Sequence, residues 1–211
     1  MGLYFPRRVP AMLKASKYSS VIAFYEKLKR RFFSEMNLKL VIEIGGSTGN
    51  NVQHLFPDSE YYNIDLKDSS DIPTIVADVS SCIPITDVDL VFSNDCLEHV
   101  KKPWLAAQNI EKCLKPGGIC FISTIFSWRY HPVPEDYWRF SPAGLEALFE
   151  NLICLGTNFG IKQRRNDIRG FWDNKKDAVP IDELGGWREN WRAWYLGKKP
   201  AMNNASLALE T

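Results

Sequence analysis

Short runs of β-branched and other apolar residues recur along the first two thirds of the chain, separated by amphipathic or turn-bearing stretches. These runs predict five strands, at about 38–45, 60–66, 74–79, 88–94 and 119–124. We expect one helix from Asn50 to about Phe56 and another from Trp104 to Leu114. Strands that alternate with such connections predict an α/β fold with a parallel sheet and helices on both faces.

The last third of the chain predicts one helix and two further strands. Ser141 and Pro142 suit the cap and first position of a helix, and residues 152–160 and 190–198 are the strand candidates. Trp187, Trp191 and Trp194 also fit helical spacing, so a helix is an alternative to the last strand.

Composition is typical of a soluble protein with one core. The chain has 211 residues, of which 45% are hydrophobic and 24% are charged. No apolar run approaches the roughly 18 residues of a membrane span, and the first ten residues do not resemble a signal peptide. Five cysteines form no CxxC pair, which indicates reduced thiols in the cytoplasm and no metal site.

Charge is unevenly distributed along the chain. The first 40 residues carry a net charge of +7 and the remainder carries −6. Four of the nine basic residues lie on a predicted amphipathic helix, Tyr18–Met36, which we expect to cap the sheet and border the active site. Such a basic segment suits contact with an anionic surface or substrate, and a solvated helix face explains it equally well.

The first predicted strand runs into a glycine-rich turn between Val41 and Asn50. The spacing does not match a dinucleotide fingerprint, and the Lys of a phosphate-binding P-loop is missing. What remains is an acidic residue, then Gly, a small residue and Gly at alternate positions. This pattern resembles the first motif of class I S-adenosylmethionine-dependent methyltransferases, with Ser47 in place of the usual central glycine. By this resemblance the cofactor is S-adenosyl-L-methionine, and the turn binds it through Glu43, Gly45, Gly46, Ser47 and Gly49.

Two further acidic positions resemble the same family. Asp65 ends the second strand, 16 residues beyond Gly49, where a carboxylate can accept hydrogen bonds from both hydroxyls of the cofactor ribose. Asp68 or Asp71 takes this role if the register differs. Asp78 and Val79, at the end of the third strand, resemble the position that meets the adenine amino group.

The fourth strand leads into Asp95–Val100. The segment from Asp89 to Val100 is very similar to the fourth-strand motif of small-molecule methyltransferases. By this resemblance Asn94 contacts the cofactor and Asp95 faces the methyl acceptor. His99 is either a structural imidazole or a base. The resemblance also implies a Rossmann-like, doubly wound sheet of seven strands in the order 3-2-1-4-5-7-6, with an antiparallel last hairpin.

The segment from Phe126 to Pro142 is rich in aromatic, proline and titratable residues, a composition typical of binding loops. Its string His-x-x-Pro-x-Asp-Tyr-Trp-Arg-Phe-Ser-Pro looks like a subgroup of bacterial methyltransferases associated with glycan modification. His131 and Asp136 are the candidate bases, with His99 third. Tyr137, Trp138 and Arg139 are expected to shape the acceptor site, and Arg139 suits a phosphate or carboxylate on the acceptor. Alternatively, Asp136 and Arg139 pair and pin the loop.

The leading hypothesis is therefore O-methylation of a small molecule or glycan. The alternatives are methylation of nucleic acid or protein through the basic helix, and a non-catalytic methyltransferase-like module. The fourth strand lacks the Asn/Asp-Pro-Pro-aromatic signature of enzymes that methylate base amino groups, so nucleic acid is not the expected partner. We expect a helical cap at 1–37, a methyltransferase domain at 38–200 with an insertion or lid at 161–189, and a flexible tail at 201–211.

Overall fold

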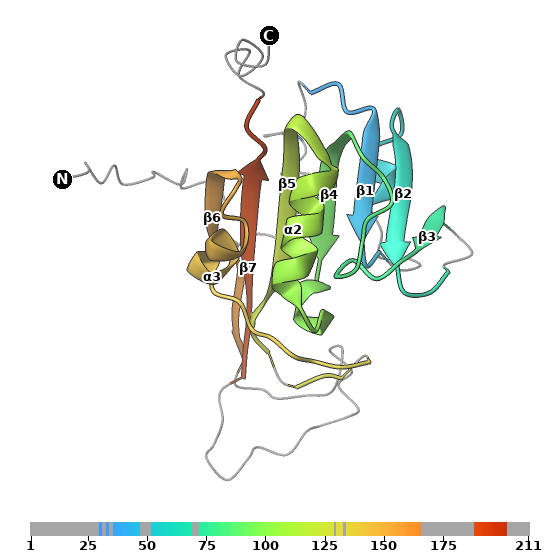
Figure 1. Ribbon diagram of the computed structural model, residues 1–211. Helices are drawn as coiled ribbons and strands as arrows, with labels where there is room; N and C mark the ends of the chain where they lie inside the picture. Colours follow the sequence, from blue (N-terminus) through green and yellow to red (C-terminus); the bar gives the residue numbers. More distant parts are fainter. Residues whose placement is uncertain are drawn as a thin grey trace, which may run out of the picture.

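The computed structural model describes residues 30, 33, 36–46, 52–68, 72–128, 130–132, 134–165 and 188–201. These residues form one seven-stranded sheet with helices packed against it (Figure 1). The predicted basic helix at Tyr18–Met36 lies outside the described residues except for residues 30, 33 and 36. The turn residues Ser47 and Gly49 and the predicted tail beyond Ala201 also lie outside them.

Five strands of the sheet are parallel, and the seventh and sixth add an antiparallel hairpin. The strand order is β3-β2-β1-β4-β5-β7-β6, which confirms the predicted order. The strands are β1 (Leu40–Ile44), β2 (Glu60–Asp65), β3 (Thr74–Val76), β4 (Val88–Asn94), β5 (Leu114–Ser127), β6 (Ile153–Arg165) and β7 (Arg188–Lys198).

The order of the strands reverses between β1 and β4. From β1 the chain proceeds outward to β2 and β3, whereas β4 returns to the other side of β1 and leads to β5. Ligands of open α/β sheets bind beyond the carboxyl ends of the strands at such a reversal. We call the region where β1, β2, β4 and β5 end the carboxyl edge.

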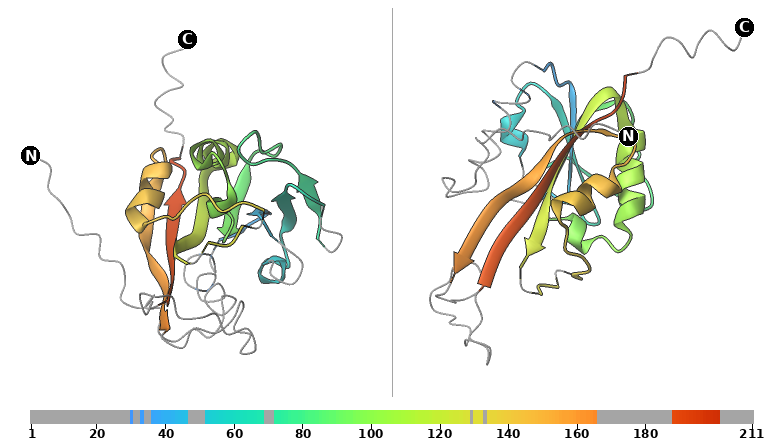
Figure 2. Two further views of the ribbon diagram at one scale, coloured as in Figure 1. Left: turned by 90° about the horizontal axis from the view of Figure 1, so that it is seen from below. Right: turned by 90° about the vertical axis from the view of Figure 1, so that its left-hand side faces the viewer.

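Alternating side chains of the strands feed two separate core clusters. In β1, Ile42 and Ile44 pack with α2 (Pro103–Cys113) and α3 (Pro142–Leu148), whereas Val41 packs on the opposite face. Both α-helices lie on the same side of the sheet, and the short 3₁₀ helix η4 (Gln53–Leu55) lies on the other (Figure 2). The predicted helix at 50–56 is reduced to η4 over the residues described.

The helix α3 begins as predicted, because the Ser141 hydroxyl accepts a hydrogen bond from the Gly144 N–H and Pro142 takes the first position. The last strand is also confirmed, and the helical alternative for its tryptophans is wrong. β7 lies between β5 and β6, so Trp194 and Tyr195 are buried on both of its faces.

The third predicted strand ends early, since β3 stops at Val76 and Asp78 lies in the turn that follows. Of the expected insertion or lid at 161–189, the ends belong to paired strands, with Arg165 opposite Arg188. Residues 166–187 lie outside the described part. No helix among the described residues is long and apolar enough to cross a membrane.

Candidate functional site

The turn after β1 depends on two glycines. Gly45 has a positive φ of 76°, and a Cβ there would lie 2.6 Å from the Cys96 sulfur. At Gly46 a Cβ would lie 2.9 Å from side-chain atoms of Asn63 and Glu43. The Gly46 N–H donates to the Asn63 side-chain oxygen at 2.8 Å, and the Asn63 amide donates to the Gly46 carbonyl at 3.0 Å. Glycine is therefore required at both positions, because any side chain would push the turn away from the sheet.

Glu43 is a buried carboxylate whose hydrogen bonds reach Val52 and Tyr61 of β2. Its Oε2 accepts hydrogen bonds from the Val52 N–H, at 2.9 Å, and from the Tyr61 hydroxyl. Burial raises the pKa of Glu43 to about 7, although these two hydrogen bonds favour the charged form. Glu43 therefore links β1 to Val52 and to β2, and the structure gives it a positioning role.

Asp65 and Cys96 lie next to Gly45 at the carboxyl edge. The negative charges of Glu98, Asp65 and Asp95 all act on Cys96, and burial together with these charges raises the pKa of its thiol to about 12. Cys96 is thus not a thiolate nucleophile at neutral pH. The Asp65 carboxylate accepts a long hydrogen bond from the Lys67 N–H, at 3.3 Å. Its position at the end of β2 matches the one predicted for a ribose ligand.

Asp78 and Val79 lie beyond β3 and belong to a turn. The Asp78 carboxylate accepts hydrogen bonds from the Ser80 N–H at 2.8 Å and from its hydroxyl at 2.7 Å. Val79 is buried, and its carbonyl accepts from the Asn109 side chain at 2.9 Å. The Asp78 side chain therefore stabilises its own turn, and its second oxygen has only the Ser81 hydroxyl at 3.5 Å.

The end of β4 presents Asn94 and Asp95 to the carboxyl edge. The side-chain oxygen of Asn94 is buried and has no hydrogen-bond partner within the described part of the chain. Asp95 has a positive φ of 48° and forms a two-pronged ion pair with Arg192 of β7, at 2.8–2.9 Å. Such strained, fixed polar residues are typical of functional sites.

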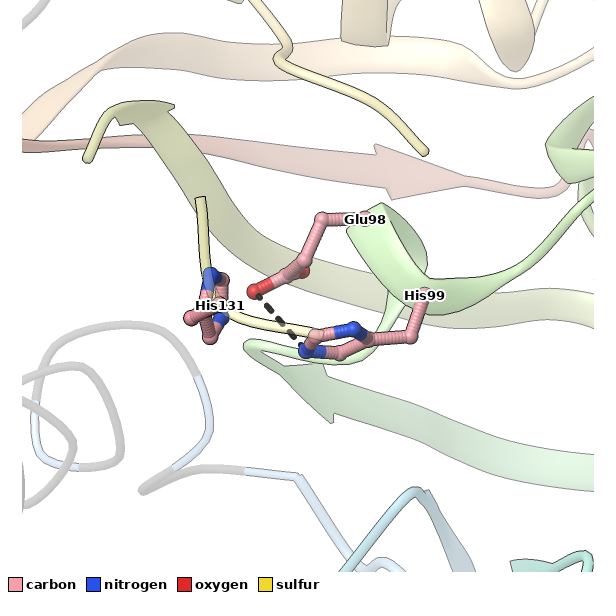
Figure 3. A group of neighbouring side chains, drawn as sticks. All are labelled: Glu98, His99 and His131. Carbon is pink, nitrogen blue, oxygen red and sulfur yellow. Dashed lines mark ion pairs between the residues drawn. The ribbon is translucent and has the colours of Figure 1, made fainter. Parts of the chain in front are cut away.

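Directly after Asp95, the 3₁₀ helix η5 (Leu97–His99) brings Glu98 and His99 to His131 (Figure 3). Oε2 of Glu98 accepts a hydrogen bond from the Thr124 hydroxyl at 2.6 Å, and its Oε1 lies 3.9 Å from Nε2 of His99. The two imidazole rings meet edge to face, with centroids 4.8 Å apart. Burial, reinforced by the charge of Asp95, raises the pKa of Glu98. We call Glu98, His99 and His131 the EHH cluster.

His131 is held by Asp136, which in turn is held by Arg139. The Asp136 carboxylate accepts from the His131 N–H at 2.8 Å and lies 3.0 Å from its Nδ1. The Arg139 guanidinium donates to both Asp136 oxygens and to the carbonyls of Trp128 and Trp138. These hydrogen bonds from Arg139 hold the pKa of Asp136 well below its ordinary value, so Asp136 is a weak base. The geometry gives Asp136 the role of positioning His131, and it gives Arg139 a role in pinning the loop.

Aromatic side chains surround this loop on the solvent side. Trp104 of α2 and Trp138 meet edge to face, with centroids 6.0 Å apart, and both are partly exposed. Tyr130 and Tyr137 are also exposed. Backbone hydrogen bonds from Tyr137 and Trp138 to the Glu98 carbonyl fasten the aromatic loop to η5. The predicted acceptor residues Tyr137 and Trp138 therefore lie beside the EHH cluster.

A family model described as "Methyltransferase domain" matches residues 18–164, which is more than half of the chain. The chain belongs to the methyltransferase-domain family. Its fold is that of the class I S-adenosylmethionine-dependent methyltransferases. A search of curated proteins found no significant match.

Several solved structures share the methyltransferase fold at low sequence identity. YcgJ of Bacillus subtilis is 12% identical with a TM-score of 0.59, over 86% of this chain and 98% of that one. A phosphoethanolamine N-methyltransferase of Haemonchus contortus, solved with phosphomonomethylethanolamine and S-adenosylhomocysteine, is 17% identical with a TM-score of 0.56, over 82% of this chain and 51% of that one. The 1,6-didemethyltoxoflavin-N1-methyltransferase of Burkholderia thailandensis is 14% identical with a TM-score of 0.54, over 85% and 78%.

The methyltransferase domain brings most predicted site residues to one edge of the sheet. Gly45, Gly46, Asp65 and Asn94 meet there, and the predicted base candidates lie beyond β4 and β5. Sequence reasoning did not single out several residues that hold this site together, namely Tyr61, Asn63, Glu98, Thr124 and Arg192. The string Leu-Glu-His-Val contained a signal for Glu98, because a glutamate directly beside a candidate histidine at a strand end can share its site.

Proposed function

We propose that this methyltransferase transfers a methyl group from S-adenosyl-L-methionine to an oxygen atom of a small molecule or glycan. The observation that carries the proposal is the meeting of Gly45, Asp65 and Cys96 at the reversal between β1 and β4. This meeting supports a cofactor role for these residues, because nucleotide ligands of this architecture bind at the same edge of the sheet. The cytoplasm is the compartment that we propose, on the basis of the cysteine content.

The described residues fit the cofactor. The tight turn at Gly45 and Gly46 allows the backbone to approach a ligand. The buried oxygen of Asn94 provides an acceptor that none of the described residues satisfies. Asp65 is proposed to bind the ribose hydroxyls, and Asp78 with Val79 the adenine. Ser47 and Gly49, which lie outside the described residues, complete the proposed set. The cofactor, when bound, supplies a methyl group on a positively charged sulfur.

The acceptor is proposed to bind between the EHH cluster and the aromatic residues of the loop. Aromatic faces that combine apolar surface with nearby polar groups suit a sugar or other small hydroxyl-bearing molecule. Holding the acceptor oxygen in line with the methyl group can supply on the order of 7–11 kcal/mol of the barrier. A hydroxyl acceptor must also lose its proton, and His131, His99 and Glu98 are titratable groups at this position.

The test is binding and transfer with methyl-labelled S-adenosylmethionine. In calorimetry, Asp65→Ala is expected to weaken cofactor binding by at least about 100-fold, because two hydrogen bonds to a charged acceptor are worth about 1.5–3 kcal/mol each. Asp58→Ala is the matched control, since Asp58 is an exposed carboxylate just before β2.

Two results would contradict the proposal in different ways. Undiminished binding in Asp65→Ala would refute the ribose assignment. Mass spectrometry of glycan and metabolite pools from cells with and without the protein tests the acceptor. A labelled methyl group found only on nitrogen, or on protein or nucleic acid, would refute the proposed substrate class.

A further inference from the structure

We propose that Glu98, His99 and His131 bind a divalent metal ion through one carboxylate oxygen and two imidazole nitrogens. One such atom from each residue lies within 4.8 Å of the others (Figure 3). Ligands that share one ion about 2.0–2.2 Å away lie roughly 3–4 Å apart. Small side-chain rotations are therefore enough to close the EHH cluster around a cation.

The buried carboxylate of Glu98 is the strongest argument for a cation. The side chain is completely inaccessible to solvent. The Thr124 hydroxyl satisfies Oε2, but Oε1 has no hydrogen-bond partner among the residues that the structure describes. A buried carboxylate oxygen without a donor is costly, and a metal ion supplies the missing interaction. In Figure 3 this carboxylate points between the two imidazole rings.

Both histidines are held in the tautomer that a metal ligand needs. Nδ1 of His99 lies 2.5 Å from the Glu135 carbonyl oxygen, which can only accept, so this nitrogen carries the hydrogen. Nδ1 of His131 faces the Asp136 carboxylate, which is ionised because it pairs with Arg139. In each neutral ring the lone pair is then on Nε2. Metal-binding histidines are commonly oriented in this way by a carbonyl or carboxylate.

The donor set indicates the kind of ion. Two imidazoles and one carboxylate favour Zn²⁺, Mn²⁺, Fe²⁺ or Co²⁺ over Ca²⁺ and Mg²⁺, which prefer all-oxygen sites. Three protein ligands leave open positions, as in catalytic metal sites. The neighbouring Asp95 is already paired with Arg192, so it is not part of the proposed ligand set. The absence of cysteine pairs predicted no metal site, but the proposed ligand set contains no cysteine.

The use of this site rests on the proposed function. A cation lowers the pKa of a hydroxyl that it binds, as it lowers that of water from 15.7 to about 7 in the best cases. The acceptor hydroxyl then loses its proton to solvent, its oxygen bonds to the methyl carbon, and the carbon–sulfur bond breaks with its electron pair passing to sulfur. With their lone pairs on the ion, His99 and His131 are ligands rather than bases.

The experiment uses the full chain, stripped with a chelator and titrated with Zn²⁺ in calorimetry and with Co²⁺ by absorption. We expect one ion per chain and a rise in the unfolding temperature on binding. His131→Ala and His99→Ala should each weaken binding at least about 100-fold. His54→Ala is the matched control, because His54 is the third histidine of the chain and is exposed on η4.

Glu98→Gln also tests metal binding if the variant folds. The variants of the two half-buried histidines test metal binding without relying on it. The proposal is overturned if the folded wild type binds neither ion at millimolar concentration, or if His131→Ala and wild type bind equally. Cofactor binding by the same samples separates the two claims. A cation site without cofactor binding refutes the proposed function alone. Transfer that persists without any bound cation refutes the role of the cation in transfer alone.

Discussion

Glu43 and Glu98 are buried glutamates at neighbouring strands of the sheet, but their hydrogen-bond partners differ. Glu43, in β1, has the Val52 N–H and the Tyr61 hydroxyl as donors. Glu98, just beyond β4, has Thr124 on one oxygen and leaves the other directed at two histidines. Burial raises the pKa of both carboxyls. Glu43 therefore stabilises the fold through donors within the protein. Oε1 of Glu98 has no described donor and is available to the proposed cation.

The largest expected effect separates the two glutamates by activity. Glu98→Gln should reduce methyl transfer by roughly 10²–10⁴-fold, the contribution typical of activating an acceptor proton. Glu43→Gln keeps an oxygen for both donors and should lose less than about tenfold in transfer. Initial rates with labelled S-adenosylmethionine, with cofactor binding measured in parallel, check this. Equal losses of methyl transfer in the two variants would contradict the different roles of Glu43 and Glu98.

The second effect separates them by stability. Glu43→Ala leaves two buried donors without an acceptor and should lower the free energy of unfolding by about 2–4 kcal/mol. Glu98→Gln, measured without added metal, should change it by less than about 1 kcal/mol, because glutamine can keep the hydrogen bond from Thr124 and Oε1 has no described partner to lose. Urea denaturation followed by circular dichroism measures both. A larger loss for Glu98→Gln would show that Glu98 is a structural residue.

The third effect is a pH dependence that belongs to Glu43. Since the fold raises the pKa of Glu43 from 4.5 to about 7, the folded protein binds this proton more tightly than the unfolded chain does. Its contribution to stability is fully present below about pH 4.5 and is lost as the pH rises to about 7. Glu43→Gln should therefore flatten the stability profile across this range by on the order of 2 kcal/mol. An unchanged slope would show that Glu43 is ionised throughout.

The smallest effect compares two adjacent tyrosines of β2. Tyr61 donates to buried Glu43, whereas the Tyr62 hydroxyl donates to exposed Glu60. Tyr61→Phe should cost about 1–2 kcal/mol in unfolding free energy, and Tyr62→Phe less than about 0.5 kcal/mol. Thermal and urea unfolding of the pair would reveal equal costs if the buried hydrogen bond were unimportant.

Local pattern predicted β1, β2 and β4 well because each is a short run of mainly apolar residues next to turn residues. β4 has the predicted bounds, and β2 ends one residue before the predicted strand. Strand three was predicted too long, because Asp78 bonds its own turn instead of extending β3. These outcomes depend on residues that are neighbours in sequence.

The site was less predictable because its contacts join distant segments. The glycine pattern identified the turn at Gly45, but not Asn63, which fixes the turn from β2. Likewise, His131 was predicted as a base, but its neighbour Glu98 lies 33 positions earlier and was not singled out. Packing between strands, which no local pattern encodes, made Glu98 a buried carboxylate.

The most direct test of the account is a crystal structure of this protein with S-adenosylhomocysteine. We expect the ligand at the carboxyl edge, with its ribose hydroxyls within hydrogen-bond distance of Asp65 and its amino acid part beside Gly45 and Gly46. Its sulfur should face the EHH cluster. A ligand bound elsewhere, or with its sulfur directed away from that cluster, would contradict the account.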